Sequence, residues 1–113
     1  MTWTKICKLA DIVNYTGVAA LVGGKQIAIF RVEDQVFAVS NLDPFTKQNV
    51  ISRGIVGSKN GKFKVASPLL KHNFFLETGE YVEDPSIKLE TFAVKLEGGE
   101  VTVDSLEKEV VSS

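Results

Sequence analysis

The stretch SPLLKHNFFLETGE, residues 67–80, decides how this chain is interpreted. Pro68 has no amide hydrogen and cannot complete a strand ladder, so it predicts a loop here and not a central strand. The following NFF run predicts a short strand, and Thr78-Gly79 predicts a turn. A loop held between two strands is a common place for binding or catalytic groups. This loop, however, offers only mild chemistry: one serine, one histidine, one lysine and apolar side chains.

Short strands separated by turn signals make up most of the remaining chain. The dipeptides Gly23-Gly24, Asn60-Gly61 and Gly98-Gly99 favour tight turns and separate runs with strand character. These runs cover residues 3–8, 17–22, 26–32, 35–40, 62–67, 91–97 and 100–103. No window shows a sustained helical period. The sequence therefore predicts one all-β domain over residues 1–104, an antiparallel sandwich or a partly open barrel.

Three other segments carry local expectations. Residues 26–32 are apolar on both faces, which predicts a strand covered on both sides. Residues 81–89 contain Pro85 and predict a loop. Residues 105–113 predict a C-terminal tail, either a short helix around residues 106–109 or a frayed end.

Composition excludes several classes of protein. Thirteen basic and fourteen acidic residues give a net charge of −1, which does not fit a nucleic-acid-binding surface. The apolar runs are too short to span a bilayer, so we expect no membrane association. No signal-peptide core follows the N-terminus, which predicts a cytoplasmic protein. Cys7 is the single cysteine, so an intrachain disulfide is impossible.

The chain offers few groups for catalysis or metal binding. Cys7 and His72 are its one cysteine and one histidine, and they cannot complete a four-ligand zinc or iron–sulfur site. We expect Cys7 to pack as a small apolar group and His72 to lie on a loop surface. Ser67, His72 and an acid such as Asp43 or Glu77 do not define a catalytic triad without its geometry. We therefore expect no catalytic, cofactor-binding or metal residues, and a binding or subunit role.

A second loop with a proline, Asn41-Leu42-Asp43-Pro44-Phe45, completes the pattern. Together with Ser67-Pro68-Leu69-Leu70, Phe74 and Thr78-Gly79-Glu80, it resembles the Rieske-type iron–sulfur domains. In that family a Cys-x-His loop and a Cys-Pro-x-His loop hold a [2Fe–2S] cluster through two thiolates and two imidazoles. The similarity covers residues 3–104, including the hairpin of residues 92–103. It implies a Rieske-like antiparallel fold.

The ligand positions depart from the family pattern. The resemblance places Asn41, Asp43, Ser67 and Leu70 where the four ligands would be. Leucine cannot ligate a metal, and the other three do not replace two thiolates and two imidazoles as a set. The resemblance therefore implies a Rieske-like domain that has lost its cluster.

Three segments narrow the resemblance further. Residues 41–45 (NLDPF), 52–57 (SRGIVG) and 66–69 (ASPL) are similar to the small subunits of bacterial assimilatory NAD(P)H-dependent nitrite reductases. This implies a non-catalytic subunit whose partner is a large subunit with FAD, a [4Fe–4S] cluster and sirohaem. The large subunit would reduce nitrite to ammonia in nitrate and nitrite assimilation. Two alternatives stay open: a Rieske-type electron-transfer ferredoxin and a stand-alone protein-binding scaffold domain.

The loss of a metal cross-link raises the question of what holds the two loops together. We expect apolar packing among Pro44, Phe45, Leu69 and Leu70, with hydrogen bonds from Asn41, Asp43 and Ser67 to loop backbone. An apolar surface beside basic groups is also a candidate docking surface for the large subunit. We call this surface the tip; its residues are Phe45, Leu69, Leu70, Lys71 and His72.

Overall fold

The computed structural model describes residues 3–107, which fold into eleven strands and two short 3-10 helices. The elements are β1 (Trp3–Lys8), η1 (Leu9–Asp11), β2 (Gly17–Val22), β3 (Lys25–Val32), β4 (Gln35–Ser40), η2 (Ile51–Arg53), β5 (Ile55–Lys59), β6 (Lys62–Ala66), β7 (Asn73–Phe75), β8 (Glu80–Tyr81), β9 (Asp84–Lys88), β10 (Thr91–Glu97) and β11 (Glu100–Glu107). None of the helices in this part of the chain is long and apolar enough to cross a membrane.

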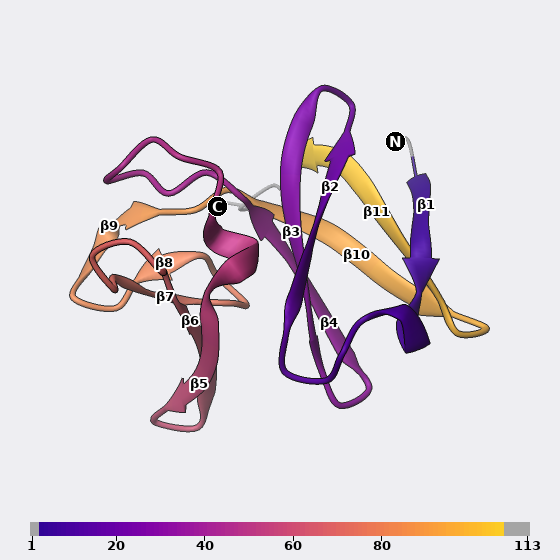
Figure 1. Cartoon of the computed structure of the whole chain (residues 1–113), viewed down its shortest axis with the longest axis horizontal. Coiled ribbons are helices and arrows are strands. Elements are labelled where there is room, and N and C mark those ends of the chain that lie inside the picture. Colours follow the sequence, from indigo (N-terminus) through magenta and orange to yellow (C-terminus); the bar gives the residue numbers. More distant parts are fainter. Residues whose placement is uncertain (1–2, 108–113) are drawn as a thin grey trace, which may run out of the picture.

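The strands form two antiparallel sheets, which confirms the all-β prediction. One sheet has the order β1-β11-β10-β4-β3-β2, and the other has the order β5-β6-β7-β8-β9. Figure 1 shows the six-stranded sheet on the right and the five-stranded sheet on the left. Strands β4 and β10 pair at Val39–Thr91 and Ala38–Phe92. Beyond these two pairs no further register between them is found in residues 3–107, so the larger sheet is partly open there.

The residues at the turns explain where the chain forms hairpins. Gly23-Gly24, Asn60-Gly61 and Gly98-Gly99 connect consecutive antiparallel strands, as the sequence predicted. All six residues have positive φ, between 54° and 80°. Glycine and asparagine adopt this left-handed conformation at low cost, so these dipeptides fix the register of their hairpins.

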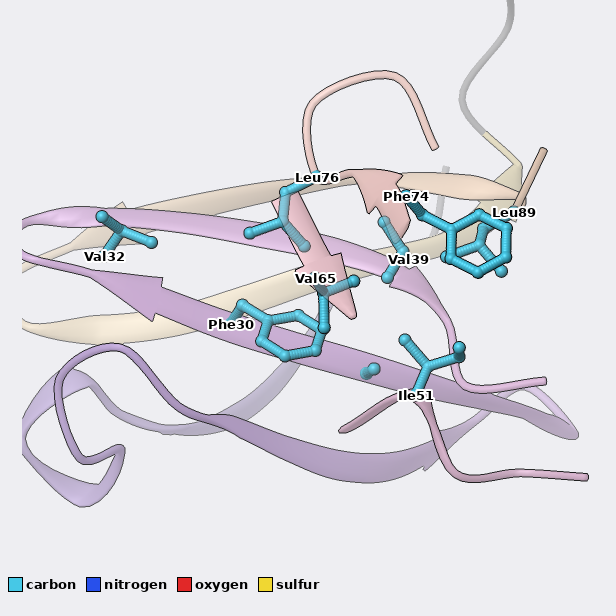
Figure 2. Close-up of a cluster of buried hydrophobic side chains, with 9 residues drawn as sticks. Phe30, Val32, Val39, Ile51, Val65, Phe74, Leu76 and Leu89 are labelled. Atoms are coloured by element: carbon cyan, nitrogen blue, oxygen red, sulfur yellow. The ribbon is translucent and has the colours of Figure 1, made fainter. Parts of the chain in front are cut away.

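Strand β3 separates two apolar cores and contributes side chains to both. Ala28, Phe30 and Val32 face the core between the two sheets, and this core also contains Val39, Ile51, Val65, Phe74, Leu76 and Leu89 (Figure 2). Ile27 and Ile29 face a second core formed within the larger sheet, together with Ile12, Val22, Ala38, Phe92, Val101 and Val103. These five apolar side chains of β3 are fully buried. The prediction of a strand covered on both sides is therefore confirmed.

The prediction of a loop over residues 81–89 is wrong. This segment contains Tyr81 of β8 and all of β9, with Glu80 paired to Lys88 and Tyr81 paired to Asp84. Pro85 lies in β9, the outermost strand of its sheet. An outer strand has one unpaired side, so it accepts a residue without an amide hydrogen.

The C-terminal segment also differs from the prediction, as far as residue 107. The sequence predicted that the tail begins at residue 105, either as a short helix around residues 106–109 or as a frayed end. Strand β11 instead continues through Glu107, and Glu107 pairs with Phe92. The rest of the predicted tail, residues 108–113, lies outside the described residues.

The two Pro-bearing loops meet at one end of the five-stranded sheet. The first loop joins β4 to η2, and the second joins β6 to β7. Both lie at the left end of the molecule, beside β7, β8 and β9 (Figure 1). The fold thus brings together two segments separated by more than twenty residues.

Candidate functional site

Asn41 fixes the base of the first loop. Its side-chain nitrogen donates to the side-chain oxygen of Gln26 at 3.2 Å and to the backbone oxygen of Asn49 at 3.3 Å. Its side-chain oxygen accepts the backbone N–H of Ser52 at 2.7 Å. Asn41 is only 2% exposed, so these bonds satisfy an amide that burial would otherwise penalise. Asn41 therefore holds loop backbone, as the sequence predicted.

Asp43 connects the first loop to the second. One carboxylate oxygen accepts the backbone N–H groups of Phe45 at 2.8 Å and Thr46 at 3.3 Å. The other accepts the hydroxyl of Ser67 at 2.5 Å. Asp43 and Ser67 are 0% and 1% exposed. This buried bond joins two segments 24 residues apart, and hydrogen bonds to an ionised group are among the stronger ones.

Aromatic rings form a second connection between the loops. The Phe45 ring stacks on the His72 ring with centroids 3.8 Å apart, and Tyr81 approaches the edges of both rings at 5.0 and 5.3 Å. Phe74, which is fully buried, lies 5.6 Å from Tyr81 and 6.2 Å from Phe45. We call Phe45, His72, Phe74 and Tyr81 the aromatic cluster. Such pairs contribute about 0.5–1.5 kcal/mol each beyond the area they bury.

The sequence predicted that His72 lies on a loop surface, and the structure differs. It is half-buried in the aromatic cluster, and its backbone oxygen accepts the N–H of Ser67 at 2.8 Å. Its Nδ1 atom is buried without a hydrogen-bond partner. Ser67 directs its hydroxyl to Asp43, so these residues do not form the serine–histidine pair of a catalytic triad.

Leu70 and Lys71 adopt a conformation that their side chains disfavour. Their φ angles are 59° and 54°, in the left-handed region. Left-handed backbone costs a residue with a side chain about 1–2 kcal/mol. Asn60-Gly61, in the same sheet, has similar φ angles with residues suited to them. The turn at Leu70-Lys71 is therefore strained.

The prediction that Pro44, Phe45, Leu69 and Leu70 pack together is wrong for Leu70. Its side chain is 73% exposed, because the left-handed turn directs it away from the loops. Pro44 and Leu69 are half-buried, and Phe45 is 37% exposed while one ring face covers His72. The buried hydrogen bond and the aromatic cluster, and not Leu70, join the two loops.

The donor set does not fit a [2Fe–2S] cluster. Such a cluster needs two thiolates and two imidazoles, and the resemblance assigns those positions to Asn41, Asp43, Ser67 and Leu70. Three of these are committed to hydrogen bonds within the loops, and the fourth is apolar and exposed. In residues 3–107 no group of three or more His, Cys, Asp or Glu side chains could hold a metal ion.

A groove on another part of the surface does not supply an alternative site. It has a volume of about 560 Å³ and lies where β4 and β10 diverge. Phe37, Phe63 and Phe75 line it, and its charged lining groups are Lys62 and Glu77. One lysine and one glutamate among aromatic side chains define no recognisable reaction.

Cys7 packs against the second core, as expected from the sequence. Burial, and secondarily the negative charge of Asp11, raises the pKa of its thiol. Reactive cysteines usually have a lowered pKa, so Cys7 has the properties of a structural residue.

Sequence and structure comparisons define the class of the protein. The family described as Rieske-like [2Fe-2S] domain matches residues 2–104. A ferredoxin of carbazole 1,9a-dioxygenase from Nocardioides aromaticivorans shares the fold with a TM-score of 0.79 over 91% of this chain and 97% of its own, at 21% identity. The chain is thus a Rieske-like domain, built around loops with a different donor set.

More similar proteins narrow this class. The nitrite reductase (NADH) small subunit of Salmonella typhimurium is 46% identical over 101 residues, which cover 88% of this chain and 94% of that protein. A crystal structure described as a putative NADH-dependent nitrite reductase small subunit from Mycobacterium tuberculosis has a TM-score of 0.87 at 37% identity, covering 90% of this chain and 93% of its own. The chain belongs to the family of nitrite reductase small subunits.

One relative has a different organisation. The nitrite reductase [NAD(P)H] large subunit of Klebsiella oxytoca contains a segment that is 40% identical to this chain over 101 residues. The match covers 89% of this chain but only 11% of the Klebsiella protein. A domain of this kind therefore occurs within a much longer nitrite reductase polypeptide.

Proposed function

We propose that this chain is the non-catalytic small subunit of an NAD(P)H-dependent nitrite reductase in the cytoplasm. It binds a large subunit that carries FAD, a [4Fe–4S] cluster and sirohaem and that reduces nitrite to ammonia with six electrons. The observation that carries the proposal is the 46% identity to a small subunit over nearly its whole length. The Klebsiella relative supports the partner, because there a similar domain and a large subunit share one chain.

The chemistry of the loops supports the non-catalytic role. Asn41, Asp43 and Ser67 are buried and engaged in bonds that hold the loops. None of them is presented to a substrate. The contribution of the chain to the reaction is therefore structural: it binds the large subunit and stabilises its active form.

An activity titration tests this proposal. Purified large subunit is mixed with increasing amounts of this chain, and nitrite-dependent NAD(P)H oxidation is measured. We expect the rate to rise and to saturate as a complex forms. A rate that stays at its initial value, without complex formation by gel filtration, would contradict the proposal and favour a stand-alone scaffold.

The ferredoxin alternative makes a different prediction. A [2Fe–2S] protein is coloured, and its reduced form has an electron paramagnetic resonance signal. Because the donor set does not fit the cluster, we expect the chain purified without oxygen to be colourless and to give no such signal after dithionite reduction. An iron–sulfur signal in proportion to protein would favour the ferredoxin.

A further inference from the structure

We infer that the strained turn Leu70-Lys71 is the anchor with which this chain binds the large subunit. The inference rests on the proposed function, because it assigns a binding surface to the proposed partner. It goes further by selecting two residues of the tip and by giving the chemistry of the site that receives them.

The first argument is the cost of the turn. Strained backbone persists where the surrounding structure enforces it, and it occurs most often at functional sites. Here both sides of the turn are fixed. Before it, Ser67 is bonded to Asp43, and after it, His72 lies in the aromatic cluster. The N–H of Ser67 and the carbonyl of His72 close the loop at 2.8 Å. The fold thus imposes a conformation that the residues between these anchors disfavour.

The second argument is the nature of the side chains. Asparagine and glycine would relieve the strain, as they do at Asn60-Gly61. The turn instead presents a leucine that is 73% exposed. Leu42 and Phe45, in the other loop, are 40% and 37% exposed, and the Phe45 ring stacks on His72, the residue after the turn. An exposed apolar side chain on a turn whose two ends are fixed has the properties of a docking surface, because little conformational freedom is lost when a partner covers it.

Charge indicates the character of the receiving site. Lys71, in the turn, and Lys47, in the first loop, are both exposed. Neither takes part in the three ion pairs found among residues 3–107. Leu70 enters an apolar recess of the large subunit, and a carboxylate at the rim of this recess faces Lys71.

A double substitution separates stability from binding. Leu70→Asn with Lys71→Gly gives the turn the residues of Asn60-Gly61. We expect the melting temperature of the isolated chain to rise, by about 4–8 °C for each kcal/mol of strain removed. We expect the dissociation constant for the purified large subunit to increase at least tenfold. Lys71→Gly alone keeps Leu70, so it should raise the melting temperature and weaken binding much less.

Val13→Asn provides a matched control. Val13 is 72% exposed, and the segment between η1 and β2 that contains it lies below β2 and β3, away from the left end of the molecule where the two loops lie (Figure 1). We expect this variant to bind like the original chain. Binding of the double variant within twofold of the original chain would overturn the inference while leaving the proposed function intact. Absence of binding by the original chain would overturn both.

Discussion

The hydroxyl of Ser67 and the carboxylate of Asp43 form the main polar contact between the two loops. In Rieske domains with a cluster, metal ligands would join these loops, and metal binding would contribute to folding. Here one 2.5 Å hydrogen bond connects the same two segments. Because Asp43 is fully buried, its carboxylate depends on this bond and on two backbone N–H groups.

Removal of the Ser67 hydroxyl tests this contact. Ser67→Ala leaves one buried oxygen of Asp43 without its donor, and we expect a loss of about 1–3 kcal/mol in the free energy of unfolding. Urea denaturation measures this change. Ser58→Ala removes the same hydroxyl from an exposed position in β5 and should stay within about 0.5 kcal/mol. Equal effects of both substitutions would show that the Asp43–Ser67 bond is not a stabilising contact.

Cys7 provides a prediction about reactivity. Because its pKa is raised by burial and by Asp11, less thiolate is present at pH 8.5 than in an exposed cysteine. We expect iodoacetamide to alkylate the folded chain more slowly than the same chain in urea, as measured by mass spectrometry over time. The difference should shrink as the pH rises above the raised pKa. Equal rates in both states would contradict this description of Cys7.

For individual loop residues, the sequence indicated which side chains form hydrogen bonds but not where the side chains point. It predicted hydrogen bonds from Asn41, Asp43 and Ser67 to loop backbone, because short polar side chains in turns commonly bond to nearby backbone. Asn41 and Asp43 form such bonds, whereas the Ser67 hydroxyl donates to the Asp43 side chain. The sequence-based prediction misplaced Leu70 and His72. Their orientation depends on the left-handed turn between Ser67 and His72 and on a contact with Phe45, 27 residues away, neither of which has a local sequence signal.

At the scale of the elements, the turn before β8 contains the glycine position with the least room for a side chain. Gly79 has φ +79°, its carbonyl accepts the N–H of Leu89 at 2.8 Å, and a Cβ there would lie 2.2 Å from the carbonyl oxygen of Leu89. This glycine allows the segment before β8 to lie directly against the segment between β9 and β10. The aromatic cluster depends on this arrangement because Tyr81 follows two residues later.

Gly79→Ala should therefore destabilise the chain severely. We expect a loss of about 3 kcal/mol or more, because the substitution adds a clash with backbone to the cost of a left-handed alanine. Gly24→Ala is the matched control, since Gly24 has φ +80° and open space around its Cβ position. It should cost about 1 kcal/mol. Thermal unfolding of both variants checks this difference, and equal losses would contradict the argument.

The ends of a strand were predictable where the alternation of polar and apolar residues and a flanking turn signal indicated the same boundary. The predicted ranges 17–22, 35–40 and 91–97 coincide with β2, β4 and β10. These sequence signals did not predict strands β8 and β9. β8 has two residues, too few for any periodicity, and β9 contains Pro85, which normally argues against a strand. Only their pairing with each other and with β7 makes them strands.

On the scale of the whole molecule, two apolar cores and two joined loops hold residues 3–107 together. Strand β3 contributes five fully buried side chains to the cores, and the loops are held by a hydrogen bond and by the aromatic cluster. The overall fold and the family were predictable from the two loop segments. The hydrogen bond and the aromatic cluster that join the two loops could be found only in the structure.

A chelator experiment tests metal independence. We expect the melting temperature of the chain to be the same, within error, with and without EDTA, because no described contact between the loops requires a metal. Differential scanning calorimetry measures this. A substantial decrease with EDTA, reversed by added iron or zinc, would show that a metal stabilises the fold.

Native mass spectrometry shows whether an iron-free chain binds the large subunit of a nitrite reductase. The large subunit is purified from cells that also produce this chain, and the intact complex is weighed before the chain is released and weighed alone. We predict that the complex contains the chain and that the released chain has its sequence mass of 12.4 kDa, without added iron or sulfide. A large subunit that carries no copy of the chain, or a released chain heavier by a [2Fe–2S] cluster, would contradict the account.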